Sequence, residues 1–316
     1  MPLTRDLSVN SAKLPEAYSY RYVLQLAVVF VLYFGAGKLG LAVPFTSFNV
    51  SPVWPAAGIA VSVVLIWGIR IAPAIVLAAF LVNFTSSMSV PVSLGIGLGN
   101  ASSAMLAGYL LKRRSDFETS LPRLRDVLRF VLLAAVVATA IAASVGVTSL
   151  TIAHIKAWSS YGSAWRVWWL GDAMGVLVVA PLLVTGRELI RLCRGRALEA
   201  GLLCIAILAT SFTVFGSRVA VRDDVLAFVV FPFVVWAAIR FRVAGAAVAG
   251  LLVATVAVWG TAQGFGPFVK HTPLHNAALL QVFIAVTSLT GLILAAVMNE
   301  RQCEIGRASS GAHFGT

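Results

Sequence analysis

Residues 167–185 read VWWLGDAMGVLVVAPLLVT, a nearly unbroken apolar run with one charged side chain, Asp172. An α-helix needs about 20 mainly apolar residues to cross the hydrocarbon core of a bilayer, so this run predicts a membrane-spanning helix. The apolar residues are continuous rather than alternating, which argues against a strand of a membrane barrel. Runs of the same kind recur along the chain on both sides of this one.

The composition extends this prediction to the whole protein. The chain has 316 residues, of which 59% are hydrophobic and 11% are charged, and its mean hydropathy is +0.93. Soluble domains carry about 25% charged residues, so the charge deficit excludes an ordinary soluble enzyme. A disordered chain is excluded as well, because such chains are poor in apolar residues. We therefore predict an all-α, polytopic bundle of helices in a membrane.

Ten spans are expected, within a range of eight to ten, because two of the apolar runs are short for a crossing. The expected spans are 22–43, 51–69, 71–87, 89–111, 130–153, 167–185, 200–216, 225–239, 243–262 and 277–298. The chain then divides into three parts. These are a cytoplasmic segment at 1–21, a membrane-embedded domain at 22–298, and at 299–316 either the cytoplasmic start of a signalling helix or a truncated tail.

The basic residues predict the orientation of these spans. With the N-terminus inside, 18 of the 24 Lys and Arg residues fall in inside segments and five fall outside. Cytoplasmic loops carry such an excess, so both termini are predicted to be cytoplasmic. The same bias accounts for the net charge of +12. Nucleic-acid binding is not expected, because no basic segment comes with a folded module to present it.

Two ionisable side chains fall inside the expected spans. Lys38 lies in the outer part of the first span and Asp172 lies early in the sixth, so both belong to the outer half of the bilayer. A charge within a span costs about 2.5–3.5 kcal/mol on insertion scales, which makes each a candidate functional residue. Three interpretations stay open: a buried ion pair that only joins two helices, an outward-facing cavity where Asp172 meets a ligand or proton, and a Lys38 side chain that extends to the headgroups.

Amide and aromatic side chains fall at compatible depths. Asn49 and Trp54 belong to the turn NVSPVWP, whose prolines predict a bent, partly unwound start of the second span. Asn83 lies near the outer end of the third span, Asn100 near the middle of the fourth, and Trp169 at the start of the sixth. An interhelical hydrogen bond is the ordinary use of each amide. The candidate ligand-binding or signalling residues are Asp172, Lys38, Asn49, Trp54, Asn83, Asn100 and Trp169.

The sequence contains no catalytic or metal-binding pattern. The three cysteines form no Cys-x-x-Cys pair and the histidines of the outer loops are far apart, so neither a disulfide framework nor a metal site is predicted. The glycine run at 95–99 is not a nucleotide loop, because no strand precedes it. Hydrolase, metalloprotease, kinase and cyclase signatures are also missing. No cofactor and no enzymatic activity are therefore expected of this chain.

Several motifs resemble the first family of bacterial membrane-associated sensor (MASE) domains. They cover about 22–300, and the Trp-Pro and Trp-Leu-Gly-Asp motifs are the most specific. The motifs are Asn49-Val-Ser-Pro-Val-Trp-Pro-Ala-Ala-Gly-Ile-Ala60, Leu98-Gly-Asn100, Trp168-Trp-Leu-Gly-Asp172-Ala-Met-Gly-Val, Ala180-Pro-Leu-Leu183, Trp236-Ala-Ala-Ile-Arg240, Trp259-Gly-Thr-Ala-Gln-Gly-Phe-Gly-Pro-Phe268 and Leu280-Gln-Val-Phe. The chain departs from the usual pattern after Asn299-Glu-Arg-Gln302, where an expected charged helix gives way to Gly/Ser-rich sequence.

The resemblance implies an integral-membrane sensory input domain in the inner (plasma) membrane of a bacterium. Such domains usually precede a histidine kinase, a diguanylate cyclase or a phosphodiesterase. The implied partners are a small ligand or membrane cue of unknown identity, a cytoplasmic signalling effector, the lipid bilayer and, as a further option, a second copy of the chain. A secondary transporter of a small solute and a stand-alone membrane scaffold stay open as alternatives, since many spans, an intramembrane Asp and a proline-broken helix also fit a carrier.

Overall fold

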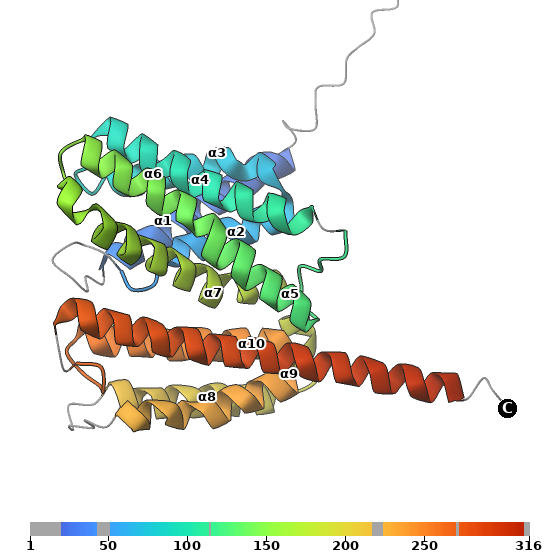
Figure 1. The fold of residues 1–316 in the computed structure, drawn as a ribbon. Coiled ribbons are helices and arrows are strands. Elements are labelled where there is room, and N and C mark those ends of the chain that lie inside the picture. Colours follow the sequence, from blue (N-terminus) through green and yellow to red (C-terminus); the bar gives the residue numbers. More distant parts are fainter. Residues whose placement is uncertain (1–19, 43–50, 114, 217–223, 270–271, 313–316) are drawn as a thin grey trace, which may run out of the picture.

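The computed structural model describes residues 20–42, 51–113, 115–216, 224–269 and 272–312, and every regular element in these ranges is a helix (Figure 1). The α-helices are α1 (Tyr20–Ala42), α2 (Pro55–Trp67), α3 (Ala72–Phe84), α4 (Val90–Lys112), α5 (Leu124–Arg129), α6 (Thr139–Ile152), α7 (Tyr161–Arg194), α8 (Ala197–Phe215), α9 (Phe231–Ala262) and α10 (Pro273–Ala312). A π-helix, η3 (Phe130–Ala138), joins α5 to α6. The short 3-10 helices are η2 (Ile69–Ile71), η4 (Trp158–Ser160) and η5 (Asp224–Val230).

Helix α7 contacts helices from both the earlier and the later parts of the chain. It packs against α2 and α6 on one side and against α9 and α10 on the other. In Figure 1 the first six helices form one group and α8, α9 and α10 form a second group. Besides the contacts of α7, the second group meets the first where α10 packs against α5 and where Gln281 of α10 bonds to Pro52, ahead of α2. The contacts of α7 and those of α10 therefore join the two groups.

Prolines and one glycine set the helix boundaries of the first group. A proline stands in the first turn of α2, α3 and α4, where its fixed φ suits the helix and its missing N–H is not needed. Helix α2 ends at Gly68, whose φ of 86° is a conformation that glycine adopts without strain. Helix α2 is buried over nearly its whole length, so other helices rather than lipid surround it.

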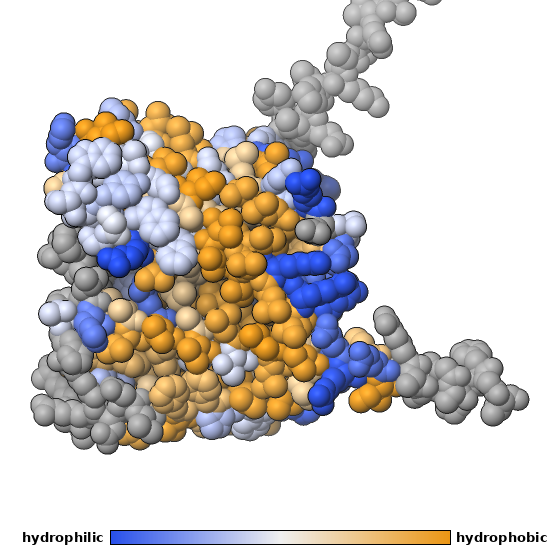
Figure 2. Space-filling model, in the orientation of Figure 1, coloured by the Kyte–Doolittle hydropathy of each residue, from blue (hydrophilic) through white to orange (hydrophobic). Residues whose placement is uncertain are grey.

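Seven helices in the described part of the chain are long and apolar enough to cross a membrane. They are Tyr20–Ala42, Val90–Lys112, Leu124–Ile152, Trp158–Arg194, Ala197–Phe215, Leu226–Ala262 and His275–Ile305. Figure 2 shows hydrophobic side chains around the middle of the molecule and hydrophilic side chains toward its two ends. This distribution is that of a multi-pass membrane protein, as the sequence predicts.

The seven candidate spans do not by themselves establish the expected ten. The second and third expected spans correspond to α2 and to the helical stretch Ile69–Phe84, which are apolar but shorter. The eighth and ninth expected spans both fall within Leu226–Ala262. That helix is divided at Arg242, whose φ of 54° and ψ of −149° are not helical. The count of ten and the cytoplasmic termini stay predictions.

The helices of the second group pack closely because the backbones of α8 and α9 approach each other. A Cβ atom at Gly260 in α9 would lie 2.0 Å from the carbonyl oxygen of Phe215, the last residue of α8. The Phe215 ring is fully buried. It stacks on Phe268 with ring centroids 5.9 Å apart, and its centroid lies 5.3 Å from that of the Phe283 ring of α10. Gly260 therefore permits an aromatic cluster that joins α8, α9 and α10.

Replacing Gly260 by Ala is expected to lower the unfolding temperature of the purified protein in detergent, because the new methyl group must push α8 and α9 apart. Overpacking of this kind costs about 1–3 kcal/mol. Gly201→Ala is the matched control, since Gly201 in α8 has open space around its Cβ position, and alanine favours a helix there by about 1 kcal/mol. Equal unfolding temperatures for the two variants would contradict the close contact.

Candidate functional site

The segment that leads into α2, residues 51–54, crosses α7 with almost no side chain between the two backbones. The Trp54 N–H donates a 2.9 Å hydrogen bond to the Gly171 carbonyl. A Cβ atom at Gly175 would lie 1.8 Å from the Trp54 carbonyl oxygen, and one at Gly58 would lie 2.3 Å from the Gly175 oxygen. Glycine is therefore required on both sides of this crossing.

Residues 51–54 form the lead-in to α2. The local sequence explains why this lead-in is not helical. Pro55 starts α2 and disfavours a helical conformation at Trp54, whose φ of −103° and ψ of 89° lie outside the helical region. The Ser51 hydroxyl donates a 2.6 Å hydrogen bond to the Val53 carbonyl and closes a small turn. The Trp54 N–H is thereby left for α7.

Asp172 follows Gly171 on α7 and lies next to the crossing. Its side chain is 1% exposed, and its Oδ2 atom has no hydrogen-bond partner among the described residues. The Trp168 indole, one turn earlier on α7, is within side-chain hydrogen-bonding reach of the carboxyl. The buried Tyr33 side chain of α1 is close enough to interact electrostatically with Asp172 and lies beside the Trp54 side chain. These four residues, Asp172, Trp168, Tyr33 and Trp54, are named the Asp172 cluster.

Two further glycines make room for the indole rings of the Asp172 cluster. A Cβ atom at Gly40 in α1 would lie 2.8 Å from the Trp54 ring, and one at Gly146 in α6 would lie 2.8 Å from the Trp168 ring. The cluster is therefore enclosed by α1, α2, α6 and α7. Aromatic rings rather than basic groups surround the carboxyl, and such a setting solvates a charge poorly.

Lys38 does not pair with Asp172. Its Nζ atom donates to the Ser86 hydroxyl at 3.1 Å and to the Val82 carbonyl at 3.5 Å, and it lies 5.9 Å from the centroid of the Phe34 ring. Val82 and Ser86 are at the end of α3, where carbonyls without helical partners attract a cation. Of the three interpretations of the sequence, the ion pair is not formed, and Lys38 instead joins α1 to the end of α3.

The two amides of α3 and α4 bond within their own helices. The Asn83 side chain donates to the Ala79 carbonyl at 2.8 Å, and the buried Asn100 side chain donates to the Ile96 carbonyl at 2.9 Å. Each bond joins residues four positions apart. Similar depth along the spans therefore does not bring these amides to the Asp172 cluster, and their predicted role in ligand binding stays a prediction.

Trp169 bonds to the neighbouring helix rather than to the Asp172 cluster. Its Nε1 atom donates to the Val136 carbonyl at 2.8 Å. Val136 belongs to η3, and the wider turns of a π-helix alter the helical hydrogen-bond ladder. The Trp169 ring also stacks on Trp165, with 5.5 Å between ring centroids. Asn49, the remaining candidate, lies outside the described residues.

The structure adds residues that sequence reasoning omitted from the candidate set. Tyr33 and Gly40 are seven positions apart and share the buried face of α1, a spacing that the sequence displays. Gln281 of α10 is buried and its side chain donates a 3.0 Å hydrogen bond to the Pro52 carbonyl of the lead-in. No local pattern connects positions 229 residues apart, so only the fold reveals this contact.

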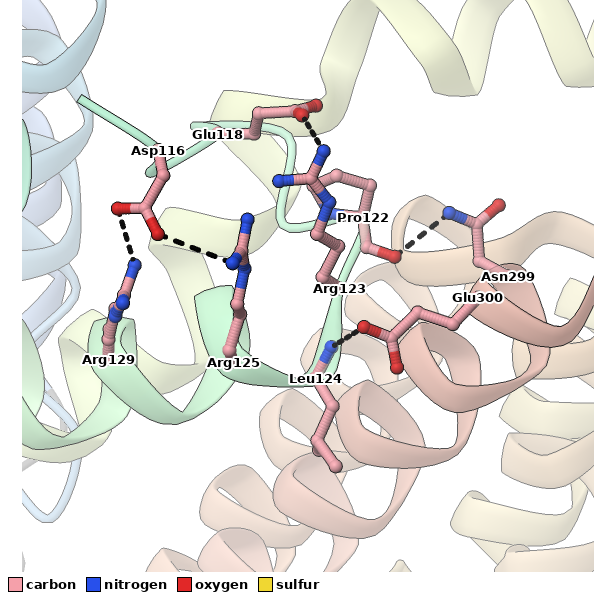
Figure 3. A network of polar contacts seen from close by, with 9 residues as sticks. All are labelled: Asp116, Glu118, Pro122, Arg123, Leu124, Arg125, Arg129, Asn299 and Glu300. Atoms are coloured by element: carbon pink, nitrogen blue, oxygen red, sulfur yellow. Dashed lines mark hydrogen bonds and ion pairs between the residues drawn. The ribbon is translucent and has the colours of Figure 1, made fainter. Parts of the chain in front are cut away.

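Helix α10 makes a second polar contact where it leaves the bundle (Figure 3). The Asn299 side chain donates to the Pro122 carbonyl at 2.9 Å, and the Leu124 N–H donates to Glu300 Oε1 at 3.3 Å. Leu124 is the first residue of α5, whose N-cap residue Arg123 provides no side-chain cap. Glu300 supplies the missing acceptor. Pro122, Leu124, Asn299 and Glu300 are named the exit clamp.

Ion pairs hold the loop before α5 in place beside the exit clamp (Figure 3). Arg123 lies 2.8 Å from Glu118, and Asp116 lies between Arg125 at 3.3 Å and Arg129 at 2.9 Å. The hydrogen bond from Arg129 holds the pKa of the Asp116 carboxyl below its usual range. These pairs therefore persist at neutral pH and weaken only as the pH falls through that lowered pKa. Because the groups are exposed, the pairs fix the loop's geometry more than they add stability.

The chemistry that the Asp172 cluster offers is binding. It presents one acidic group, one phenol and two indole N–H donors in an apolar setting, a combination that suits a proton or a polar ligand. Across the described ranges, no three His, Cys, Asp or Glu side chains gather into a set that could hold a metal ion.

The MASE1 family model matches residues 23–302, so the chain belongs to this family of membrane-associated sensory domains, as its motifs predict. A search among curated proteins and a search among solved structures each gave no match. The matched range contains the lead-in, α7 and both contacts of α10. The Asp172 cluster and the exit clamp are thus parts of a single sensory domain, and a domain of this family is an input module rather than a catalytic one.

Tyr33→Phe is expected to raise the free energy of unfolding by about 1 kcal/mol, because it removes a buried hydroxyl that completes no hydrogen bond to a described residue. Tyr22→Phe on the same helix is the control. The Tyr22 hydroxyl donates a 2.8 Å hydrogen bond to the Arg70 carbonyl, so its removal is expected to lower stability. Thermal unfolding in detergent measures both variants, and a loss of stability for Tyr33→Phe as large as that for Tyr22→Phe would contradict this account.

Proposed function

We propose that this member of the MASE1 family detects an extracytoplasmic or membrane cue at the Asp172 cluster and relays it to a cytoplasmic effector. The effector we infer is a histidine kinase or an enzyme of cyclic-di-GMP turnover in a bacterial cell, with the domain in the inner membrane. The observation that carries the proposal is a buried acidic side chain whose Oδ2 atom has no partner among the described residues, at the meeting point of four helices.

Burial makes Asp172 sensitive to what binds beside it. Burying a charged side chain inside a membrane protein is unfavourable in free energy. A ligand that donates a hydrogen bond or a proton to Asp172 therefore lowers that penalty. The same cluster includes Trp54, whose backbone bonds to α7 at Gly171. A ligand shifts a conformational equilibrium only through different affinities for two states. We propose that the two states differ in how the lead-in packs on α7.

We also propose that the chain crosses the membrane ten times, with both termini in the cytoplasm. Helix α9 then counts as two crossings, divided at Arg242, and α2 and α3 form a hairpin around η2. Strongly hydrophilic side chains gather at the end from which α10 emerges (Figure 2), in keeping with the positive-inside rule. The Asp172 cluster is then placed in the outer half of the bilayer.

Helix α10 supports the relay because it touches both ends of the domain. Gln281 bonds to the lead-in, and Asn299 and Glu300 bond to the loop before α5. At 1.5 Å per residue, the two contacts are about 27 Å apart along the helix. The hydrocarbon core is about 30 Å thick, so one unbroken helix connects the cluster with the opposite side of the membrane.

Asp172→Asn is expected to abolish the response while leaving membrane insertion unchanged. The amide keeps the shape of the carboxyl but neither carries its charge nor takes up a proton. To measure the response, a diguanylate cyclase domain is fused after residue 312 and cyclic-di-GMP is compared across growth media. Glu199→Gln is the matched carboxyl-to-amide control, because Glu199 pairs with Arg240 on the far group of helices at 2.6 Å.

Other outcomes of that experiment distinguish the alternatives. A response of the Asp172→Asn fusion equal to that of the unchanged fusion would remove Asp172 from the site. Asp172-dependent uptake of a solute into proteoliposomes would favour the secondary transporter over the sensor. A partner-dependent phenotype on deletion, without any response to the medium, would favour the membrane scaffold.

Glu300→Ala is expected to change the basal output of the same fusion, because it removes the acceptor for the Leu124 N–H and releases α10 from α5. Glu300→Gln keeps a side-chain oxygen and is expected to retain most of the coupling. Glu304→Ala, one turn further along the exposed part of α10, is the control for loss of a carboxylate. Equal output from the Glu300→Ala and Glu304→Ala fusions would show that the exit clamp plays no part in the relay.

A further inference from the structure

A hollow at the end of the bundle from which α10 emerges is lined by two arginines that have no partner among the described residues. It has a volume of about 500 Å³ and lies between the last turns of α7 and the loop before α5. Arg187 and Arg191, one turn apart on α7, both line it. Neither guanidinium forms an ion pair or a hydrogen bond with any described residue. This hollow is distinct from the Asp172 cluster, with which it shares no residue.

The two carboxylates that line the hollow are already paired with other arginines. Glu118 lies 2.8 Å from Arg123, and Glu188 lies 3.6 Å from Arg242. Their negative charge is therefore offset from outside the hollow. The positive charges of Arg187 and Arg191 remain uncompensated, and the hollow attracts an anion.

Two residues with hydroxyl groups line the hollow together with the arginines. Thr119 and Ser120 of the loop before α5 line it as well, and neither hydroxyl is engaged in a hydrogen bond with the described part of the chain. A third lining hydroxyl, that of Thr185, already donates a 2.7 Å hydrogen bond to the Pro181 carbonyl. Two guanidinium groups and two hydroxyls are thus the lining donors that have no partner among the described residues.

We propose that this hollow binds a phosphate group. Guanidinium groups bind phosphate oxygens through paired, charge-assisted hydrogen bonds, and several oxygens around one phosphorus can engage guanidinium and hydroxyl donors at once. The site lies at the end of the bundle from which α10 emerges, and there a lipid phosphodiester and a soluble phosphate offer the same chemistry. A phosphate held by Thr119 and Ser120 also orders the loop that carries the Pro122 carbonyl of the exit clamp.

The test uses the full chain purified in detergent. Native mass spectrometry measures the retention of phosphatidylglycerol against phosphatidylcholine, and isothermal titration in the absence of added lipid measures the binding of pyrophosphate. Each probe is applied to the unchanged protein and to the R187Q/R191Q variant. The matched control, R194Q/R301Q, removes the same charge at the same end of the molecule from residues that do not line the hollow.

The unchanged protein and the control are expected to bind phosphatidylglycerol or pyrophosphate, and R187Q/R191Q is expected to bind it about tenfold or more weakly. Binding of the lipid alone identifies a headgroup site, whereas binding of pyrophosphate identifies a site for soluble phosphate. R187K/R191K keeps both charges and is expected to recover part of the binding. Equal losses in R187Q/R191Q and the control, no recovery with Lys, or no binding of either probe by the unchanged protein would overturn the proposal.

Discussion

The backbone contact between the lead-in and α7 is the constraint on which the rest of the structure depends. A hydrogen bond from the Trp54 N–H to the Gly171 carbonyl marks it, and the contact exists only because Gly58 and Gly175 carry no side chains. Bringing two backbones this close places Asp172 beside aromatic rings from other helices. The buried acid, the glycine pattern and the proline-rich turn are thus parts of one arrangement, and none of them has an evident use without the others.

Helix α10 makes a different kind of contact at each end of the domain. At one end, Gln281 meets a non-helical segment whose carbonyl is free to accept a hydrogen bond. At the other, Glu300 caps a helix that lacks its own cap. Both contacts join a side chain of α10 to the backbone of the first group of helices. These two hydrogen bonds therefore do not depend on the identity of the side chains in that group.

Much of the fold could be predicted from the sequence, because hydropathy and basic residues act locally. The helical class, the membrane setting, the family and the isolation of Lys38 and Asp172 within apolar spans follow from patterns a few residues long. The hydrogen-bond partners of individual side chains could not be predicted from such local patterns. Lys38 bonds to the end of α3, and Asn100 bonds to its own helix, because packing decides which acceptor is within reach. The non-helical residue Arg242 of α9 falls between the two spans expected at 225–239 and 243–262.

Helix α10 continues as a regular helix past the exit clamp to Ala312. From Gln281 to Asn299 the helix is about 27 Å long, and α10 packs against α9 and α7. The stretch from Glu300 to Ala312 continues for about 18 Å more and begins with exposed residues, 301–305. A straight, unbroken helix has a single axis, so any tilt of the packed part is also the tilt of the projecting part.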